Sequence, residues 1–298
     1  MKKIRVSVLI LVLCVLSLPL VSLARDVAPV VDTAWVEKNI NNPKVVIVDI
    51  RKVEDYKAGH IPNAVNAFYG SWAMMKGGMR NELPAADDLF DVIGGAGIGS
   101  DSIVVLAGKN DNMSDRADPT RVAWTLKYAG VQNIAILDGG YNKWTAEKKA
   151  LSTDAVKPKA KPYKATVNAG LFVNKDYVMK SIGKAVIVDV REPDFYKGAK
   201  KLDFVSRPGH IAKAVNLPTA SKVYKQDGTY KDKTELMSMA SAVVGKDMGK
   251  EIIAYCDTGK IASVWSFLLT DLLGYKDVKI YDGSAEEWSK DPKAPLEQ

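Results

Sequence analysis

Short apolar runs rich in β-branched residues recur along the chain, separated by longer stretches of mixed polarity. The runs predicted to be buried strands include 45–48, 103–106, 185–188 and 252–255. Helices are predicted between such runs, for example over 119–129 and 262–273. Strands that alternate with helices favour a parallel sheet covered on both faces, so the predicted fold class is α/β. The order of the strands does not follow from this pattern.

Three blocks of sequence occur twice, in the same order. The first copy has VVIVDIR at 45–51, GHIPNAVN at 59–66 and ILDGGYNKW at 136–144. The second copy has AVIVDVR at 185–191, GHIAKAVN at 209–216 and IYDGSAEEW at 280–288. Matched blocks in a fixed order indicate a duplicated unit of about 120 residues.

A stretch of lysines and prolines separates the two copies. The sequence KPKAKPYK at 157–164 has no apolar period, which predicts a solvated linker. We therefore predict one domain at 25–150, a linker at 151–170 and a second domain at 171–298.

The first 24 residues have the pattern of a secretory signal peptide. A basic start precedes the apolar core Val6–Leu18, and Pro19 and small residues ending at Ala24 follow it. An uncleaved membrane anchor is the alternative, and Pro19 with the small residues argues against it. Lipid attachment at Cys14 would require a small residue where Leu13 stands. We expect cleavage after Ala24 and a periplasmic or secreted protein that meets the membrane only through this segment.

Composition argues against two classes of function. Loss of the leader removes three basic residues and no acid, which lowers the formal charge from +7 to +4. The remaining charge is spread without a basic tract or interleaved aromatics, so we expect no nucleic-acid binding. One mature thiol and two separated histidines are too few for zinc, so we expect no metal and no cofactor.

Cys256 is the main candidate for chemistry. Removing 24 of 298 residues leaves 274 with this single cysteine, which cannot form an intramolecular disulfide. It lies between a predicted strand and a predicted helix, where backbone N–H groups lack helical partners. These donors and the helix dipole favour the thiolate, and Gly259 allows the loop to curl around the sulfur. We expect an anion cradle built around a nucleophile; an inert buried cysteine is the alternative.

The repeated blocks and the cysteine loop together resemble the tandem rhodanese-type sulfurtransferases that use thiosulfate or 3-mercaptopyruvate. The shared motifs are the Asp-x-Arg strand end, the Gly-His-Ile block, the Cys-x-x-Gly loop and the Asp-Gly…Trp ending. The resemblance covers essentially the whole mature chain. It implies two rhodanese-like domains, each a small parallel sheet flanked by helices, with the first catalytically inactive and the second catalytic. Aligning Ile103–Leu106 with Ile252–Tyr255 places Ala107 opposite Cys256, so the first copy lacks a thiol.

The implied reaction transfers sulfur in two steps. The Cys256 thiolate attacks the outer sulfur of a small anionic donor, thiosulfate ahead of 3-mercaptopyruvate, and becomes a persulfide that passes its sulfur to a thiol or cyanide acceptor. The family pattern places a substrate-contacting arginine at Arg191, and donors in the loop would stabilise the outer sulfur. The expected substrate-binding residues are Arg191, Asp257, Thr258, Gly259, Lys260, Ile261 and Ala262. A non-catalytic sulfur carrier or binding protein is the alternative function.

The loop departs from the family pattern in two places. Asp257 puts an acid directly after the nucleophile, which opposes thiolate formation. Ile261 stands where related loops often carry a hydroxyl or a basic residue. Both changes leave the donor open, and a polysulfide or persulfide is a further candidate. A cysteine phosphatase would need an arginine six positions after the cysteine, where Ala262 stands.

Two pairs of residues have structural interpretations beside functional ones. Arg51 is expected to pair with carboxylates near its strand end, and for Arg191 this interpretation competes evenly with donor binding. His60 and His210 have identical Gly-His-Ile settings, one of them in the copy without a cysteine. That repetition favours hydrogen-bonding roles over a cysteine–histidine dyad.

Residues of the closing block are expected to be structural as well. Asp138 and Asp282 precede glycines and are expected to form turns or helix caps. Trp144 and Trp288 are expected to pack in the core. The glycine-rich stretch 94–99 follows a predicted helix rather than a strand, so we expect it to end a helix and not to bind a nucleotide.

Overall fold

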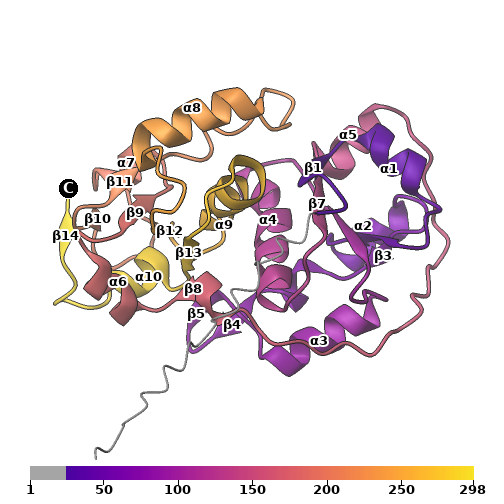
Figure 1. Ribbon diagram of the computed structural model, residues 1–298, viewed down its shortest axis with the longest axis horizontal. Coiled ribbons are helices and arrows are strands. Elements are labelled where there is room, and N and C mark those ends of the chain that lie inside the picture. Colours follow the sequence, from indigo (N-terminus) through magenta and orange to yellow (C-terminus); the bar gives the residue numbers. More distant parts are fainter. Residues whose placement is uncertain (1–24) are drawn as a thin grey trace, which may run out of the picture.

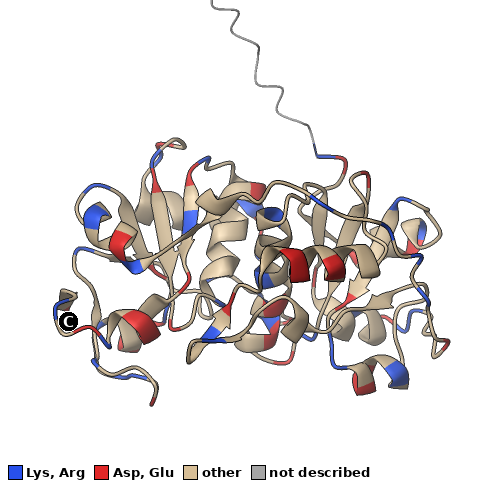
Figure 2. Cartoon of the chain, turned by 90° about the horizontal axis from the view of Figure 1, so that it is seen from below, with Lys and Arg blue, Asp and Glu red and all other residues tan. Residues whose placement is uncertain are grey.

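The computed structural model describes residues 25–298, and the expected leader at 1–24 lies outside the described residues. Two sheets, each with its own helices, lie side by side along the long axis of the molecule (Figure 1). Within residues 25–298, no helix combines the length and hydropathy that crossing a bilayer requires. Acidic and basic residues are interspersed over both halves (Figure 2).

The first half is built on a five-stranded sheet with the order β1-β7-β6-β2-β3, in which all neighbours are parallel. Its strands are β1 (Val30–Val31), β2 (Val45–Asp49), β3 (Val65–Asn66), β6 (Ile103–Ala107) and β7 (Ile134–Leu137). Its helices are α1 (Thr33–Asn39), α2 (Val53–Ala58), the 3-10 helix η1 (Tyr69–Ser71), α3 (Ala86–Gly95), α4 (Met113–Tyr128) and α5 (Gly140–Ala146). An antiparallel hairpin is formed by β4 (Met74–Lys76) and β5 (Met79–Glu82).

The second half has a parallel sheet with the order β11-β9-β12-β13-β8. Its strands are β8 (Phe172–Val173), β9 (Val186–Asp189), β11 (Val215–Asn216), β12 (Ile252–Tyr255) and β13 (Val278–Tyr281), and β10 (His210–Ile211) pairs separately with β14 (Leu296–Glu297). Its helices are η2 (Ala169–Leu171), α6 (Lys175–Ser181), α7 (Pro193–Tyr196), α8 (Lys233–Val244), α9 (Ala262–Phe267), the π-helix η3 (Leu268–Leu273) and α10 (Ser284–Trp288). Read from opposite edges, the two sheets have the same strand order, which confirms the duplication.

The predicted strands and helices are confirmed, with two differences at helix ends. The helix expected at 119–129 begins earlier, at Met113, because the Asn112 side chain caps it by accepting the N–H of Asp115 at 3.1 Å. The helix expected at 262–273 is α-helical to Phe267 and then continues as the π-helix η3.

The register of the two sheets corrects the predicted alignment of the two copies. The aspartate of the Asp-x-Arg block pairs with Ala107 in the first sheet and with Tyr255 in the second. Gly108, and not Ala107, is therefore the counterpart of Cys256. The carbonyl of Gly108 accepts the N–H of Tyr141 at 2.9 Å, as that of Cys256 accepts the N–H of Ala285 at 3.1 Å. Apolar runs look alike when shifted by one residue, but the shift moves every side chain to the other face of the sheet.

The alternation of side chains along β12 places Cys256 on the face that meets the other half. Ile252, Ala254 and Cys256 belong to one core that both halves share, whereas Ile253 and Tyr255 belong to a separate core on the outer face. Helices α4 and α9 pack against each other in the centre of this shared core (Figure 1). The cysteine therefore lies where the two halves meet.

The lysine- and proline-rich stretch 157–164 is not the free spacer that its composition suggests. Most of its side chains are exposed, but the N–H of Lys161 donates to the carbonyl of Gly94 at 3.0 Å. The hydroxyl of Tyr163 donates to the carbonyl of Ala129 at 2.8 Å. This backbone is thus held against the first half, and the ranges 25–150, 151–170 and 171–298 stay predictions.

The glycine-rich stretch 94–99 ends α3, as expected. Gly97 has a positive φ of 77°, and its N–H donates to the carbonyl of Gly94 at 3.0 Å. The N–H of Ile98 donates to the carbonyl of Ile93 at 3.1 Å, which completes a glycine-based helix end.

Candidate active site

Cys256 is buried but lies on the wall of a pocket that both halves form. The side chain is only 1% exposed. The pocket has a volume of about 210 Å³ and is lined by Arg80, Asn81 and Ser114 of the first half and by Leu202, Phe204, Cys256, Asp257, Thr258, Lys260 and Ile261 of the second. The single thiol of the described chain is thus accessible only through a small composite pocket.

The loop between β12 and α9 forms the cradle that the sequence predicts. The backbone N–H groups of Thr258, Ile261 and Ala262 are directed at the sulfur of Cys256 and act to lower the pKa of its thiol. These donors belong to the end of a loop and the first turn of a helix, where they have no helical partners. Three of the predicted site residues therefore meet at the sulfur through their backbones.

The protonation of this thiol differs from the prediction. Burial raises the pKa of Cys256 above its ordinary value, and the neighbouring carboxylate of Asp257 raises it further. The three backbone donors act in the opposite direction and do not outweigh these two effects. The surroundings of Cys256 thus favour the neutral thiol, and the expectation that they favour the thiolate is wrong.

Gly259 and Ser284 fix the shape of the loop. Gly259 has a φ of +72°, and a Cβ added there would lie 2.5 Å from Oδ1 of Asp282. The Ser284 hydroxyl accepts the N–H groups of Cys256 at 3.2 Å and Gly259 at 2.9 Å, and donates to the carbonyl of Tyr281 at 2.8 Å. Ser284 was not among the residues predicted for the site, although the change from DGG in the first copy to DGS in the second distinguishes it.

Asp138 lies in the turn before α5 and Asp282 in the bend before α10, which agrees with the predicted turns, but neither carboxylate caps a helix. The carboxylate of Asp282 pairs with the buried guanidinium of Arg121 on α4, in the other half. Oδ1 of Asp138 accepts the N–H of Tyr230, also across the contact between the halves, at 2.9 Å. Helices α5 and α10 have no side-chain cap. Both aspartates join the two halves, a role that local sequence does not encode.

Arg191 is held by protein groups on all three nitrogens of its guanidinium. Nε and Nη2 donate to Asp189 at 3.0 and 2.6 Å, Nη2 also donates to the carbonyl of Gly209 at 2.8 Å, and Nη1 reaches Asp257 at 3.4 Å. In the first half, Arg51 binds its own Asp-x-Arg aspartate and a glycine carbonyl in the same way. Arg191 does not line the Cys256 pocket. This arrangement supports the ion-pair interpretation over direct contact with a donor.

Lys260 lines the pocket but is also tied to the first half. Its ammonium donates to the hydroxyl of Ser114 at 2.8 Å and forms an ion pair with Asp118. It also lies 4.6 Å from the centre of the Tyr69 ring. Lys260 is therefore a cation at the pocket whose position depends on residues of both halves.

The histidines and tryptophans have the structural roles predicted for them. His60 stacks on Tyr56 and His210 on Tyr196, in both cases with ring centres 3.8 Å apart. Each Nδ1 is bound to the carbonyl of the stacked tyrosine. Neither histidine lines the Cys256 pocket. The paired tryptophans of the closing blocks, Trp144 and Trp288, are buried in the outer cores.

Comparison with known proteins agrees with this architecture. The family model described as "Rhodanese-like domain" matches residues 32–147 and 175–291. The chain belongs to the rhodanese-like family. The expected pair of rhodanese-like α/β domains is thereby confirmed.

Three relatives match this chain over nearly the full length of both proteins. The "Putative thiosulfate sulfurtransferase" of Mycolicibacterium smegmatis is 34% identical over 276 residues, with 90% of this chain and 96% of the relative covered. That of Saccharopolyspora erythraea is 32% identical over 275 residues, with 90% and 95% covered. The sulfur carrier protein TtuD of Thermus thermophilus is 30% identical over 283 residues, with 89% and 95% covered.

Solved structures share the fold at lower identity. The anaerobic ergothioneine biosynthesis enzyme of Chlorobium limicola, in complex with trimethyl histidine, has a TM-score of 0.76 and is 23% identical. The match covers 91% of this chain and 70% of that one. A variant of EanB in complex with hercynine has a TM-score of 0.79 at 24% identity, with 91% and 69% covered.

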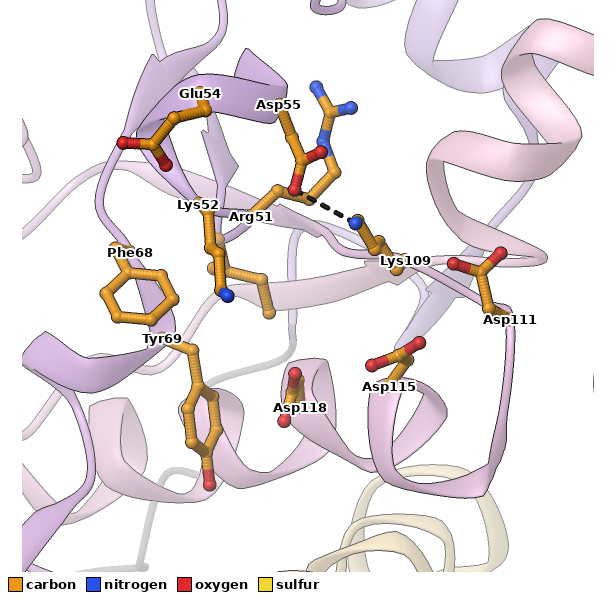
Figure 3. A pocket seen from close by; sticks show the side chains of 11 residues that line it. Arg51, Lys52, Glu54, Asp55, Phe68, Tyr69, Lys109, Asp111, Asp115 and Asp118 are labelled. Atoms are coloured by element: carbon orange, nitrogen blue, oxygen red, sulfur yellow. Dashed lines mark ion pairs between the residues drawn. The ribbon is translucent and has the colours of Figure 1, made fainter.

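The first rhodanese-like domain has a larger pocket without a cysteine. It has a volume of about 680 Å³ and is lined by Ile50, Arg51, Lys52, Glu54, Asp55, Phe68, Tyr69, Lys109, Asp111, Asp115 and Asp118. Figure 3 shows Lys109 paired with Asp55, at 2.9 Å. Tyr69 and Asp118 on its wall are the two residues that also contact Lys260 of the second domain. The domain that lacks a cysteine thus helps to position a cation at the Cys256 pocket.

Proposed function

We propose that this chain is an exported sulfurtransferase that moves sulfane sulfur from thiosulfate, through a persulfide on Cys256, to a thiol or cyanide acceptor. The observation that carries the proposal is the position of the Cys256 sulfur on a pocket wall, with three backbone N–H groups directed at it. 3-Mercaptopyruvate is the alternative donor. Export is proposed from the pattern of residues 1–24 alone.

The reaction has two half-reactions joined by the persulfide. The thiol first releases its proton to solvent, and the thiolate attacks the outer sulfur of thiosulfate. The sulfur–sulfur bond of the donor breaks, and sulfite leaves with its electron pair. The acceptor thiolate or cyanide then attacks the outer sulfur of the persulfide, becomes a persulfide or thiocyanate, and returns the Cys256 thiolate.

The cradle contributes most after the sulfur acquires charge. Its N–H groups are fixed before the reaction, so stabilising a thiolate or persulfide requires no rearrangement. In comparable anion holes one such donor lowers the barrier by roughly 3 kcal/mol. The raised pKa of the Cys256 thiol means that deprotonation is part of the barrier, and the proposal therefore implies faster transfer in mildly alkaline solution.

Support for the chemistry comes from the names of similar proteins. Two relatives at 34% and 32% identity are named for thiosulfate sulfur transfer. Another relative, at 30% identity, is named a sulfur carrier protein, which favours a carrier role as the second candidate function. The two functions share the persulfide and differ in whether a small acceptor discharges it.

The test is turnover with thiosulfate and cyanide, followed as thiocyanate release, together with mass spectrometry of the protein after exposure to the donor. We expect steady thiocyanate release and an adduct of one sulfur atom on Cys256. Cys256→Ser should abolish both signals. An adduct without turnover would favour the carrier, and turnover by the serine variant would refute the nucleophile.

Export is tested separately on the cellular protein. N-terminal sequencing of protein recovered from a periplasmic or culture fraction should begin at Arg25. Recovery of the full-length chain from the cytoplasm alone would contradict export, and it would not bear on the proposed sulfur transfer.

A further inference from the structure

We propose that Arg80, on the β4–β5 hairpin of the first domain, is the guanidinium that binds the anionic group of the sulfur donor in the Cys256 pocket. This inference rests on the proposed function and names a specificity-determining residue for it. It moves donor recognition from the catalytic domain to the domain that lacks the nucleophile.

Arg80 and Arg191 differ in whether their guanidinium groups are free to bind a ligand. Arg191, at the position expected for donor contact, is 5% exposed, and its three guanidinium nitrogens are bound to protein groups. The Arg80 side chain is 42% exposed and lines the pocket next to Cys256. Only one of its guanidinium nitrogens, Nη1, has a hydrogen-bond partner among residues 25–298. Arg80 therefore has N–H donors available to a ligand, and Arg191 does not.

Contacts on one side hold Arg80 in place. Nη1 donates to Oε1 of Glu286 at 2.6 Å, and the backbone N–H of Arg80 reaches Oε2 of the same carboxylate at 3.3 Å. The guanidinium carbon lies 4.1 Å from the centre of the Phe204 ring, within the range of a cation–π contact. Glu286 is itself buried, at 1% exposure. A planar guanidinium fixed on one side and free on the other suits an oxyanion.

Asn81, next to Arg80, connects the β4–β5 hairpin to the loop that follows Cys256. Nδ2 of Asn81 donates to the hydroxyl of Thr258 at 2.9 Å, two residues after the nucleophile. The carbonyl of Asn81 accepts a hydrogen bond from buried Arg121. Asn81 also has a φ of 58°, a conformation that asparagine tolerates better than most residues. The residue next to Arg80 thus anchors the hairpin to the loop that holds the cradle.

The lining of the pocket indicates the class of donor. Arg80 and Lys260 bring two cationic groups to the lining, paired on their far sides with Glu286 and Asp118, and Asp257 brings one carboxylate, which is paired with Arg191. The volume of about 210 Å³ accommodates only a small molecule. This chemistry fits a small donor with a sulfonate or carboxylate close to its transferable sulfur, and it disfavours neutral donors.

Two measurements on Arg80→Met and Arg80→Lys test the inference. We expect Arg80→Met to raise the KM for thiosulfate about tenfold with little change in kcat, since a hydrogen bond to a charged group is lost. Arg80→Lys should recover part of the effect, because it retains the charge and loses the planar fork. Lys76→Met is the matched control: it removes one positive charge from the same hairpin, outside the pocket, and should leave KM unchanged.

The second measurement does not depend on sulfur transfer. Cys256 is alkylated with iodoacetate, which is anionic, and with iodoacetamide, which is neutral. Arg80→Met should lower the ratio of the two rates about threefold, the factor that one unit charge a few ångströms away exerts through water. This ratio remains informative even if the protein proves inactive with every donor, so it separates failure of this inference from failure of the proposed function.

Changing Glu286, the partner of Arg80, distinguishes a purely structural role of Arg80 from donor binding. Loss of Arg80 leaves buried Glu286 unpaired, so Arg80→Met is also made together with Glu286→Gln. Relative to Glu286→Gln alone, an elevated KM and a lowered alkylation ratio in this double variant support donor binding. An unchanged KM and ratio, or a fall in kcat and stability at constant KM, would overturn the inference.

Discussion

The guanidinium of Arg121, on α4 of the first domain, forms a buried ion pair with the carboxylate of Asp282, which follows β13 of the second domain. Oδ1 of that carboxylate occupies the space beside Gly259, where a Cβ would lie only 2.5 Å away. Arg121 also donates to the carbonyl of Asn81 on the β4–β5 hairpin. One arginine of the first domain thus connects the domain contact, the pocket wall and the cysteine loop.

Breaking this ion pair should destabilise the protein strongly. In Arg121→Met the carboxylate of Asp282 loses its partner in a buried place, and such losses typically cost about 3–5 kcal/mol. We expect the free energy of unfolding in urea to fall by that amount. Arg121→Met combined with Asp282→Asn should recover part of it, because no unpaired charge remains.

An exposed ion pair provides the control for that experiment. Lys200 and Asp194 pair on the surface at 2.7 Å, with side chains 64% and 57% exposed. Lys200→Met should leave unfolding unchanged within error, because exposed pairs contribute little. Equal losses of unfolding free energy in the Arg121 and Lys200 variants would show that burial of the ion pair does not determine its contribution to stability.

Gly259→Ala should disrupt the cysteine loop through two separate effects. The φ of +72° is unfavourable for alanine, and the added Cβ would collide with Asp282. Gly274→Ala is the matched control, because Gly274 has a φ of +91° and no heavy atom within 4 Å of the added Cβ. We expect the control to lose about 1 kcal/mol of stability and to keep its activity.

The Gly259 variant should lose more stability than this control and most of its sulfur transfer, as measured by urea unfolding and thiocyanate release. Equal losses in the two variants would show that the conformation alone matters and that the close approach of Asp282 does not.

Much of the fold could be predicted from the sequence because it depends on local patterns that occur twice. Apolar runs, the matched blocks and the position of Cys256 after β12 were sufficient for the strands, the duplication and the cradle. The alignment of the two copies was shifted by one residue and placed Ala107, in place of Gly108, opposite Cys256. The shift arose because a continuous apolar run does not show which residue pairs with which on the neighbouring strand. The register is determined by the hydrogen-bonded pairing between neighbouring strands, which the apolar pattern does not reveal.

The part of the site that the sequence did not reveal depends on contacts between the domains. Asp282 looks like a turn residue beside its glycine, and its partner Arg121 is 161 positions away. Arg80 lies in a hairpin without a motif, yet it borders the same pocket as Cys256. Likewise, the presence of backbone donors around the thiol could be predicted, but the depth of its burial could not, and burial raises the pKa of Cys256.

The reactivity of Cys256 should rise with pH. Its pKa is raised by burial and then by Asp257, so the reactive thiolate is scarce at neutral pH. We expect the rate of alkylation by iodoacetamide to rise about tenfold per pH unit, without a plateau up to about pH 8.5, the ordinary pKa of a thiol. Asp257→Asn removes one of the two causes and should move the curve to lower pH. A plateau near pH 7 in the unmodified protein would contradict the raised pKa.

Asp118 should make the protein less stable as the pH rises from about 4 to 6. Burial raises the pKa of Asp118 to about 6, although the ammonium of Lys260 acts to lower it. Its pKa in the unfolded chain is about 3.9, so between these values the folded state holds a proton that the unfolded state has released. Folding is then favoured below this window and loses stability as the pH rises through it.

Removing the carboxyl group removes this dependence. Asp118→Asn should flatten the curve of unfolding free energy against pH over about 4 to 6, by about 3 kcal/mol at most. Asp194→Asn is the control, because this carboxylate is exposed and paired only with the exposed Lys200, so its removal should leave the curve nearly unchanged. Urea titrations at several pH values give both curves. If Asp118→Asn lessened the loss of stability toward acid, the carboxylate of Asp118 would be stabilised by Lys260 more than it is penalised by burial, and the order of these two effects would have to be reversed.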